Sequence, residues 1–185
     1  ASGMKLLLDF HYSDTWADPQ RQDMPDLWSK LDFATLTDSV YTYTKNVMQA
    51  LKEQGTDPDI VQVGNEINHG MMWPVGAVNN IDSLAKLFYA GVKGVKEVNK
   101  NAIIMLHLAV GGQDEEARFF LDNMLKRNVP YDVIGLSYYP KSHGTPNDLK
   151  NTMTDLTKRY HKYVLVAEYS QYIEEVNDIA FTAPG

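Results

Sequence analysis

The stretch Ile60-Val-Gln-Val-Gly-Asn-Glu-Ile-Asn-His-Gly70 decides the fold, because a buried strand leads directly into a cluster of polar groups. Its first residues are mostly β-branched and apolar, which is typical of a strand packed on both faces of a sheet. Amide, carboxyl and imidazole groups then follow within six positions. Burying an unpaired carboxylate such as Glu66 is costly, so it needs a partner or a function. A second strand with a similar ending, Val164-Leu-Val-Ala-Glu-Tyr-Ser170, supplies another carboxylate, Glu168.

Short apolar runs alternate with amphipathic segments along the rest of the chain. We expect strands at 5–11, 60–63, 102–108, 133–139 and 163–167, and helices at 35–54, 81–99, 114–127 and 147–160. This alternation predicts an α/β fold built of βα units, with a parallel sheet and right-handed crossovers. Polar residues gather at the C-terminal ends of the strands, which form the catalytic face of a (β/α)8 TIM barrel. A doubly wound sheet would more often carry a glycine-rich phosphate loop after its first strand, and none follows here.

Composition excludes several classes of function. The chain has 185 residues, of which 44% are hydrophobic and 22% charged, as in an ordinary globular domain, and we treat 1–185 as a single domain. A net charge of -7 with scattered basic residues argues against a nucleic-acid partner. No run of 18 apolar residues predicts a membrane span, and the absence of cysteine excludes disulfide and thiolate chemistry.

Five blocks, in order along the chain, resemble glycoside hydrolase family 53, the arabinogalactan endo-β-1,4-galactanases, which belong to a clan of retaining β/α barrels. The blocks are Asp9-Phe-His-Tyr-Ser-Asp14, Trp16-Ala-Asp-Pro19, Gly64-Asn-Glu-Ile-Asn68, Ser137-Tyr-Tyr-Pro140 and Ala167-Glu-Tyr-Ser170. The resemblance implies that this chain carries strands three to seven of an eight-stranded barrel. Since the first two strands and the eighth would then be missing, we expect an excerpt of a longer enzyme rather than a complete miniature one.

The resemblance also implies a reaction and two catalytic residues. The reaction is endo-acting, retaining hydrolysis of β-1,4-galactan in type I arabinogalactan of pectin side chains, with Glu66 as acid/base and Glu168 as nucleophile. Retaining hydrolysis requires two carboxyl groups about 5–5.5 Å apart, one protonated and one ionised. The alternative role for these glutamates is a structural ion pair, but neither strand offers an obvious basic neighbour.

Further residues are expected to bind the sugar or to hold the nucleophile. The resemblance implies that Asn65 holds the 2-hydroxyl group of the sugar, where hydrogen bonds strengthen in the transition state. Either Tyr138 or Tyr139 donates to Glu168; strand alternation allows only one of them to point inward. The other candidates for substrate binding are a stacking platform and four hydroxyl partners, namely Trp16, Asp9, His11, Asp14 and His107.

Structural roles compete with several of these interpretations. Asp9 and His11 could simply pair with each other, and His107 in an apolar strand could be a buried histidine with satisfied hydrogen bonds. Trp28 and Trp73 are expected to pack rather than to bind sugar.

No cofactor is predicted. A competing hypothesis is a metal-dependent hydrolase that uses Asp9, His11 and Glu66 as ligands, since Asp-x-His on a strand places both side chains on one face. Many bacterial members of the resembled family carry calcium in the loop after the seventh strand. Here residues 172–185 lack the alternating Asp-x-Asp-Gly series of a calcium loop, so we expect no calcium at that position.

The expected partner is the galactan polysaccharide, and the resemblance implies a secreted or periplasmic protein, although this sequence contains no signal segment. An incomplete barrel would expose sheet edges, which predicts self-association. Two alternatives stay open. One is an inactive or sugar-binding remnant of such an enzyme, and the other is a different retaining β-glycanase such as a cellulase or mannanase.

Overall fold

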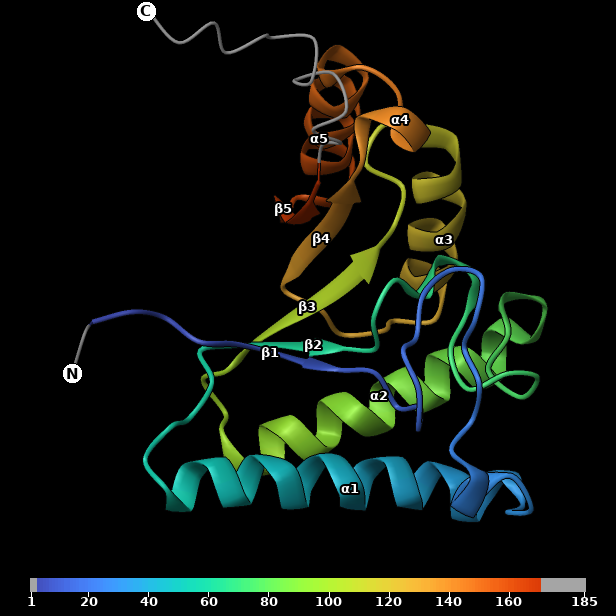
Figure 1. The fold of residues 1–185 in the computed structure, drawn as a ribbon, viewed down its shortest axis with the longest axis vertical. Coiled ribbons are helices and arrows are strands. Elements are labelled where there is room, and N and C mark those ends of the chain that lie inside the picture. Colours follow the sequence, from blue (N-terminus) through green and yellow to red (C-terminus); the bar gives the residue numbers. More distant parts are fainter. Residues whose placement is uncertain (1–2, 171–185) are drawn as a thin grey trace, which may run out of the picture.

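A computed structural model describes residues 3–170 and contains one parallel sheet of five strands (Figure 1). The strands follow one another in the sheet in the order of the sequence. They are β1 (Leu7–Phe10), β2 (Ile60–Val63), β3 (Ile103–Leu108), β4 (Val133–Tyr138) and β5 (Tyr163–Tyr169). Sequential parallel neighbours joined by helices are the connectivity of a β/α barrel, of which these strands form an arc. The predicted strands and their order are confirmed.

The helices lie on one side of this arc. Three long helices match the predicted ones closely: α1 (Phe33–Glu53), α2 (Ile81–Val98) and α3 (Asp114–Lys126). In Figure 1, α1 and α2 run side by side below β1 and β2, whereas α3 and α5 (Pro146–Tyr160) accompany the later strands. The short helix α4 (Pro140–His143) was not predicted from the sequence. Three 3-10 turns complete the structure, at Asp26–Trp28 (η1), Ile67–His69 (η2) and Val78–Asn80 (η3).

Local sequence explains where the helices begin. Asp32 caps α1, because its carboxylate accepts the backbone N–H of Thr35. Thr145 and Asp148 form a capping box at the start of α5, with Pro146 at the first helical position. None of the helices in the described range 3–170 is long and apolar enough to cross a membrane.

The two faces of the sheet differ in chemistry. One face packs against the helices with side chains such as Val61, Val63, Ile104, Leu106 and Ile134. Alternation along each strand turns the intervening residues to the other face, which is the interior of the barrel arc. Near the C-terminal ends of the strands this inner face carries polar side chains from all five strands, namely Asp9, Gln62, His107, Ser137 and Glu168.

An irregularity between β4 and β5 places one of these residues. Leu136 pairs with Val166, but the next residue, Ser137, pairs with Glu168, so Ala167 is left without an opposite residue. A bulge of this kind shifts the alternation of the strand by one residue. Without it, Ala167 would share the inner face with Leu165 and Glu168 would point outward. The bulge therefore turns Glu168 toward the other polar side chains.

Candidate active site

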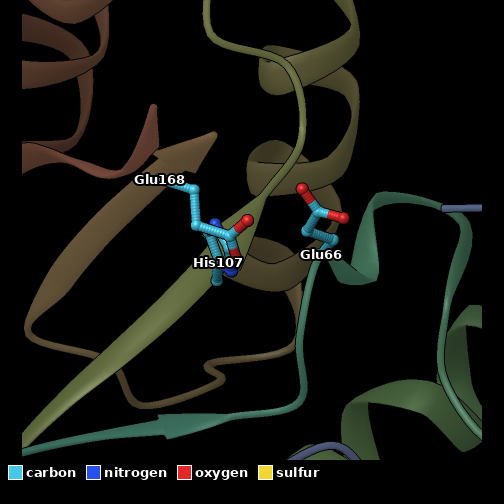
Figure 2. Close-up of side chains that lie close together, drawn as sticks. All are labelled: Glu66, His107 and Glu168. Atoms are coloured by element: carbon cyan, nitrogen blue, oxygen red, sulfur yellow. The ribbon is translucent and has the colours of Figure 1, made fainter. Parts of the chain in front are cut away.

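Glu66 follows the end of β2 in a constrained backbone conformation. Its backbone is left-handed, with φ of 50° and ψ of 50°, which is uncommon for a residue other than glycine and tends to occur at functional sites. Gly64, at φ of 85°, begins the turn. The buried side chain of Gln22 supports the turn, since its amide N–H donates to the carbonyl oxygen of Asn65 at 2.8 Å. This turn directs the carboxyl group of Glu66 toward β3 and β4 (Figure 2).

The surroundings of Glu66 favour its protonated form. The residue is only 6% exposed, and its Oε1 lies 2.5 Å from the hydroxyl oxygen of Ser137. Burial raises the pKa of Glu66 to about 7, and the negative charge of Glu168 acts in the same direction. Donation of the Ser137 hydroxyl to the carboxylate would oppose this shift in pKa. A carboxyl group with this pKa can act as an acid near neutral pH.

Glu168 lies opposite, on β5, and is only partly buried. The hydroxyl group of Tyr139 donates to its Oε2 at 2.6 Å. Burial, together with Glu168 itself, raises the pKa of Tyr139, so the phenol keeps the proton that it donates. The backbone N–H of Tyr139 donates in turn to Nδ1 of the buried His143, at 3.1 Å. The nearest side-chain atoms of Glu66, His107 and Glu168 all lie within 4.8 Å of one another (Figure 2).

Tyr138 does not take part in the site. Its hydroxyl group donates to the carbonyl oxygen of Gly144 at 3.0 Å, and its ring stacks against that of Tyr169 with the ring centroids 6.1 Å apart. The sequence left open which of the two tyrosines serves Glu168, and the structure assigns Tyr139. Tyr138 is the alternative that does not reach Glu168, because adjacent strand residues point to opposite faces.

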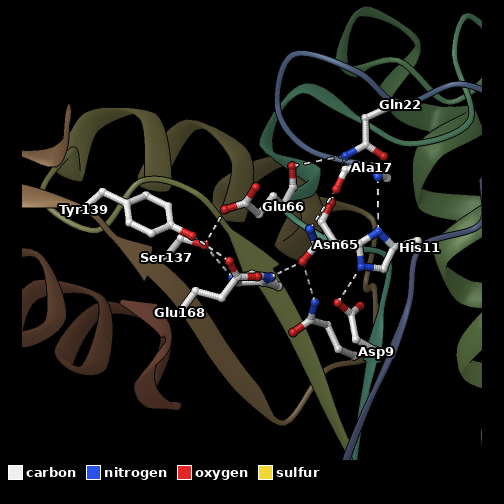
Figure 3. Close-up of polar contacts among 11 residues, drawn as sticks. Asp9, His11, Ala17, Gln22, Asn65, Glu66, Ser137, Tyr139 and Glu168 are labelled. Atoms are coloured by element: carbon white, nitrogen blue, oxygen red, sulfur yellow. Dashed lines mark hydrogen bonds and ion pairs between the residues drawn. The ribbon is translucent and has the colours of Figure 1, made fainter. Parts of the chain in front are cut away.

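Asn65 lies at the centre of a hydrogen-bond network (Figure 3), and His107 belongs to the same network. The Asn65 amide N–H donates to the carbonyl oxygen of Ala17 at 2.8 Å, and its Oδ1 accepts from Gln62 at 3.0 Å. The two ring nitrogens of His107 contact Asn65 Oδ1 and Ser137 Oγ, each at 2.9 Å. His107 is fully buried, which lowers its pKa. It is thus a satisfied buried histidine, as the structural interpretation expected, but it belongs to the network of Glu66.

Asp9 and His11 pair with each other, as one of the two interpretations expected. The Nε2 of His11 lies 3.1 Å from Oδ2 of Asp9, and this hydrogen bond raises the pKa of His11. Its other ring nitrogen accepts the backbone N–H of Ala17 at 3.2 Å. Trp16 packs against the His11 ring with a centroid distance of 4.8 Å, yet 68% of its surface is exposed. Its ring is therefore accessible to a ligand.

The remaining candidates have structural contacts. Asp14 is exposed, and its carboxylate accepts the backbone N–H of Asp26, which holds the long loop after β1. Trp28 packs edge-on against Tyr43, and the indole N–H of Trp73 donates to the carbonyl oxygen of His69.

Sequence reasoning missed three polar residues of the network, Ser137, Gln62 and Gln22. Ser137 stands two residues before Tyr139, so strand period indicates that the two share one face of the sheet. Gln62 carried a similar signal, because it interrupts an otherwise apolar strand. Gln22 comes from a distant loop and carried no such signal.

Glu66, His107 and Glu168 are also the one group in the described range whose spacing could suit a metal ion. Both ring nitrogens of His107 already contact Asn65 and Ser137, so we assign no metal to this group. The hypothesis of Asp9, His11 and Glu66 as ligands gains no support, because these three do not form such a group in the described range 3–170. The expectation about calcium concerns residues 172–185, which lie outside the described residues.

Two glutamates lie at the C-terminal ends of parallel barrel strands with carboxyl oxygens within 4.8 Å, which is the arrangement that β/α-barrel glycoside hydrolases of the retaining type use. The chain belongs to glycosyl hydrolase family 53, whose model matches residues 1–183. The expected family and barrel fold are thereby confirmed.

Relatives of known sequence or structure agree with this assignment. The chain is 37% identical to the arabinogalactan endo-beta-1,4-galactanase A of Aspergillus niger, over all of this chain and 58% of that protein. It is 43% identical to an uncharacterised protein of Niallia circulans, over 90% of this chain and 48% of that protein. The solved GH53 catalytic domain of Ignisphaera aggregans superposes with a TM-score of 0.88 at 42% identity, covering 90% of this chain and 46% of that one. The chain thus spans about half the length of the curated relatives that it matches.

Proposed function

We propose that this chain carries the catalytic pair of an endo-acting retaining galactanase, which cleaves β-1,4-galactan by double displacement. The observation that carries the proposal is the close approach of two carboxyl groups in different surroundings, within 4.8 Å of each other. Inverting enzymes need about 6.5–9.5 Å between the two groups, to leave room for a water molecule. The galactan specificity rests on the Aspergillus niger relative, which is named for that activity.

In the first step, the carboxylate of Glu168 attacks the anomeric carbon while Glu66 gives its proton to the glycosidic oxygen. The C–O bond to the leaving sugar breaks, and its electron pair takes up the proton. The pKa of about 7 keeps Glu66 protonated before this step, and the donation from Tyr139 fixes the orientation of Glu168. A covalent glycosyl-enzyme and a shortened galactan chain result.

In the second step, Glu66 acts as a base. Once Glu168 forms an ester with the sugar it carries no charge, so one of the contributions that raise the pKa of Glu66 disappears. Glu66 then takes a proton from a water molecule, whose oxygen attacks the anomeric carbon and releases Glu168. The same carboxyl group thus serves as acid and then as base because the charge opposite it changes.

The neighbouring polar groups suit a sugar in the adjacent subsite. Oδ1 of Asn65 already accepts two hydrogen bonds, so only the second N–H of its amide can donate to a hydroxyl group such as the 2-hydroxyl. Oδ1 of Asp9 is buried without a partner among the described residues, and a sugar hydroxyl could donate to it. The exposed ring of Trp16 offers a stacking surface beside these groups.

The expected substrate also indicates where the protein acts. Galactan side chains of pectin are polymers outside the cells that degrade them, so we propose that the protein acts after secretion. The fungal relative named for galactan hydrolysis is consistent with such a role.

The test is release of reducing sugar from β-1,4-galactan by the whole chain, compared with Glu66→Ala and Glu168→Ala. We expect activity that both substitutions abolish, and no activity on carboxymethylcellulose or galactomannan. A 2-deoxy-2-fluorogalactosyl donor with a good leaving group should label Glu168, as read by peptide mass spectrometry. A folded chain that neither hydrolyses galactan nor accepts this label would support the alternative of an inactive remnant, and preference for a glucan or mannan would support another β-glycanase.

A further inference from the structure

Besides a contact with the hydroxyl group of Tyr139, the hydroxyl group of Ser137 makes two contacts that together require two hydrogen atoms. Its oxygen lies 2.5 Å from Oε1 of Glu66 and 2.9 Å from Nε2 of His107, and the residue is fully buried. A serine hydroxyl supplies only one hydrogen. The second must therefore come from Glu66 or from His107.

The orientation of Asn65 decides where His107 carries its proton. One end of the Asn65 amide faces the carbonyl oxygen of Ala17, which can only accept, so that end is the NH2 group. The other end is then Oδ1, which accepts from Gln62 and lies 2.9 Å from Nδ1 of His107. Nδ1 must therefore carry a hydrogen, and in a neutral imidazole Nε2 is then a bare acceptor.

The surroundings of His107 favour the neutral ring. Its side chain is fully buried, and its two hydrogen-bond contacts are with the uncharged groups of Asn65 and Ser137. The charge of Glu168, within 4.8 Å, favours a protonated ring, but the cost of burying the charge is larger, and the pKa of His107 is lowered. Neutral His107 takes its hydrogen bond from the Ser137 hydroxyl, which leaves the Ser137 oxygen as an acceptor. The hydrogen between Ser137 and Glu66 must then belong to the carboxyl group of Glu66.

We propose that Asn65, His107 and Ser137 form a one-way hydrogen-bond chain that selects the protonated form of Glu66 and so prepares it as the acid. The inference rests on the proposed function, and it assigns Ser137 and His107 as positioning residues for the acid/base. When Glu66 loses its proton, the Ser137 hydroxyl can turn toward the carboxylate, but Nε2 of His107 then loses its donor. The alternative, uptake of a second proton by His107, places a charge in a buried position.

Other charged or titratable groups also face Glu66 and must be considered in any titration. They come from β1, from the two loops at this end of the sheet and from β5, and they are Asp9, His11, Asp18, Tyr139 and Glu168. The charged groups among them act on Glu66 at a distance, whereas Tyr139 is a neutral phenol. Ser137 acts through a direct contact, so substituting it separates the two influences.

The experiment is an NMR titration of the whole chain, labelled with 15N in histidine and 13C in the carboxyl groups of glutamate, with Glu66→Gln to assign the signal. The proposed hydrogen-bond chain predicts that His107 is neutral and carries its hydrogen on Nδ1. Ser137→Ala should lower the pKa of Glu66 by about one unit, since the protonated form loses its acceptor. Ser137→Thr keeps the hydroxyl group and should restore the pKa of Glu66 to its wild-type value. Tyr138→Phe is the matched control, because the hydroxyl group of Tyr138 donates to Gly144 and takes no part in the hydrogen-bond chain of Asn65, His107 and Ser137.

The direction of the shift decides the outcome. If Ser137 simply donated to the carboxylate, Ser137→Ala would raise the pKa of Glu66, and that result overturns the proposal. A hydrogen on Nε2 rather than Nδ1 of His107 would overturn it too. His107→Phe frees the serine hydroxyl for the carboxylate and should also lower the pKa of Glu66. None of these measurements needs a substrate. A protein in which Glu66 titrates as expected, but which hydrolyses no galactan, would therefore refute the proposed function and leave this inference standing.

Discussion

Replacing Glu66 by glutamine should change how the stability of the chain depends on pH. The amide of glutamine resembles the protonated carboxyl group, since its NH2 can donate to Ser137, but it does not titrate. The folded-state pKa of Glu66 is about 7, against an ordinary value of 4.5. Because the folded pKa is the higher one, the stabilising contribution of Glu66 is fully present below pH 4.5 and is lost as pH rises through about 7.

The size of this effect follows from the shift. A difference between about 7 and 4.5 corresponds to about 3 kcal/mol at 1.36 kcal/mol per unit. The quantity to compare is the difference in the free energy of unfolding between the wild type and Glu66→Gln. This difference should fall by this amount between pH 4 and pH 8.

Urea denaturation of both proteins at several pH values measures this double difference, and groups other than Glu66 cancel in it to first approximation. A difference that stays constant with pH would show that burial does not favour the protonated form of Glu66. A difference that grows with pH would mean that the folded state stabilises the carboxylate instead. Either result would refute the assignment of Glu66 as an acid prepared by its surroundings.

Three further substitutions test the site and its support. Tyr139→Phe should slow formation of the glycosyl-enzyme at least about tenfold, because a hydrogen bond to the charged Glu168 is lost. The rate of labelling by the fluorosugar measures this step. The control Tyr138→Phe should change that rate by less than about twofold. Trp16→Ala should weaken binding of a galactooligosaccharide about threefold to tenfold in calorimetry, as expected for loss of one stacking contact, and unchanged affinity would exclude a platform role. Gly91→Ala should destabilise the chain by about 1–3 kcal/mol in urea denaturation, since a Cβ there would lie 2.6 Å from a side-chain carbon of β2.

Much of the fold follows from the sequence because hydrophobic period and strand endings are local signals. The run at 102–108 and the amphipathic pattern at 35–54 correspond to β3 and α1 within a few residues. The position of Glu66 at a strand end was equally visible. Such features depend on neighbours in the chain, so they can be recognised before any packing is known.

Features that depend on pairing between strands could not be predicted in this way. Strict alternation from Leu165 would put Ala167, and not Glu168, on the inner face; only the bulge opposite Ser137 corrects this. The same limitation left the choice between Tyr138 and Tyr139 open. In each case the deciding contact joins residues from different strands, and no local pattern records it.

In the proposed mechanism, two residues of the same type receive opposite tasks because their hydrogen-bond partners differ. Glu66 is buried, and the oxygen of its neighbour Ser137 can accept a proton from it if the serine hydrogen belongs to His107. Glu168 is only partly buried, and its neighbour Tyr139 donates to it, with the raised pKa of the phenol keeping that proton in place. An accepting partner favours a carboxylic acid, and a donating partner favours a carboxylate. The assignment of acid and nucleophile thus depends on where the hydrogen of one serine lies, which the titration of Ser137→Ala measures directly.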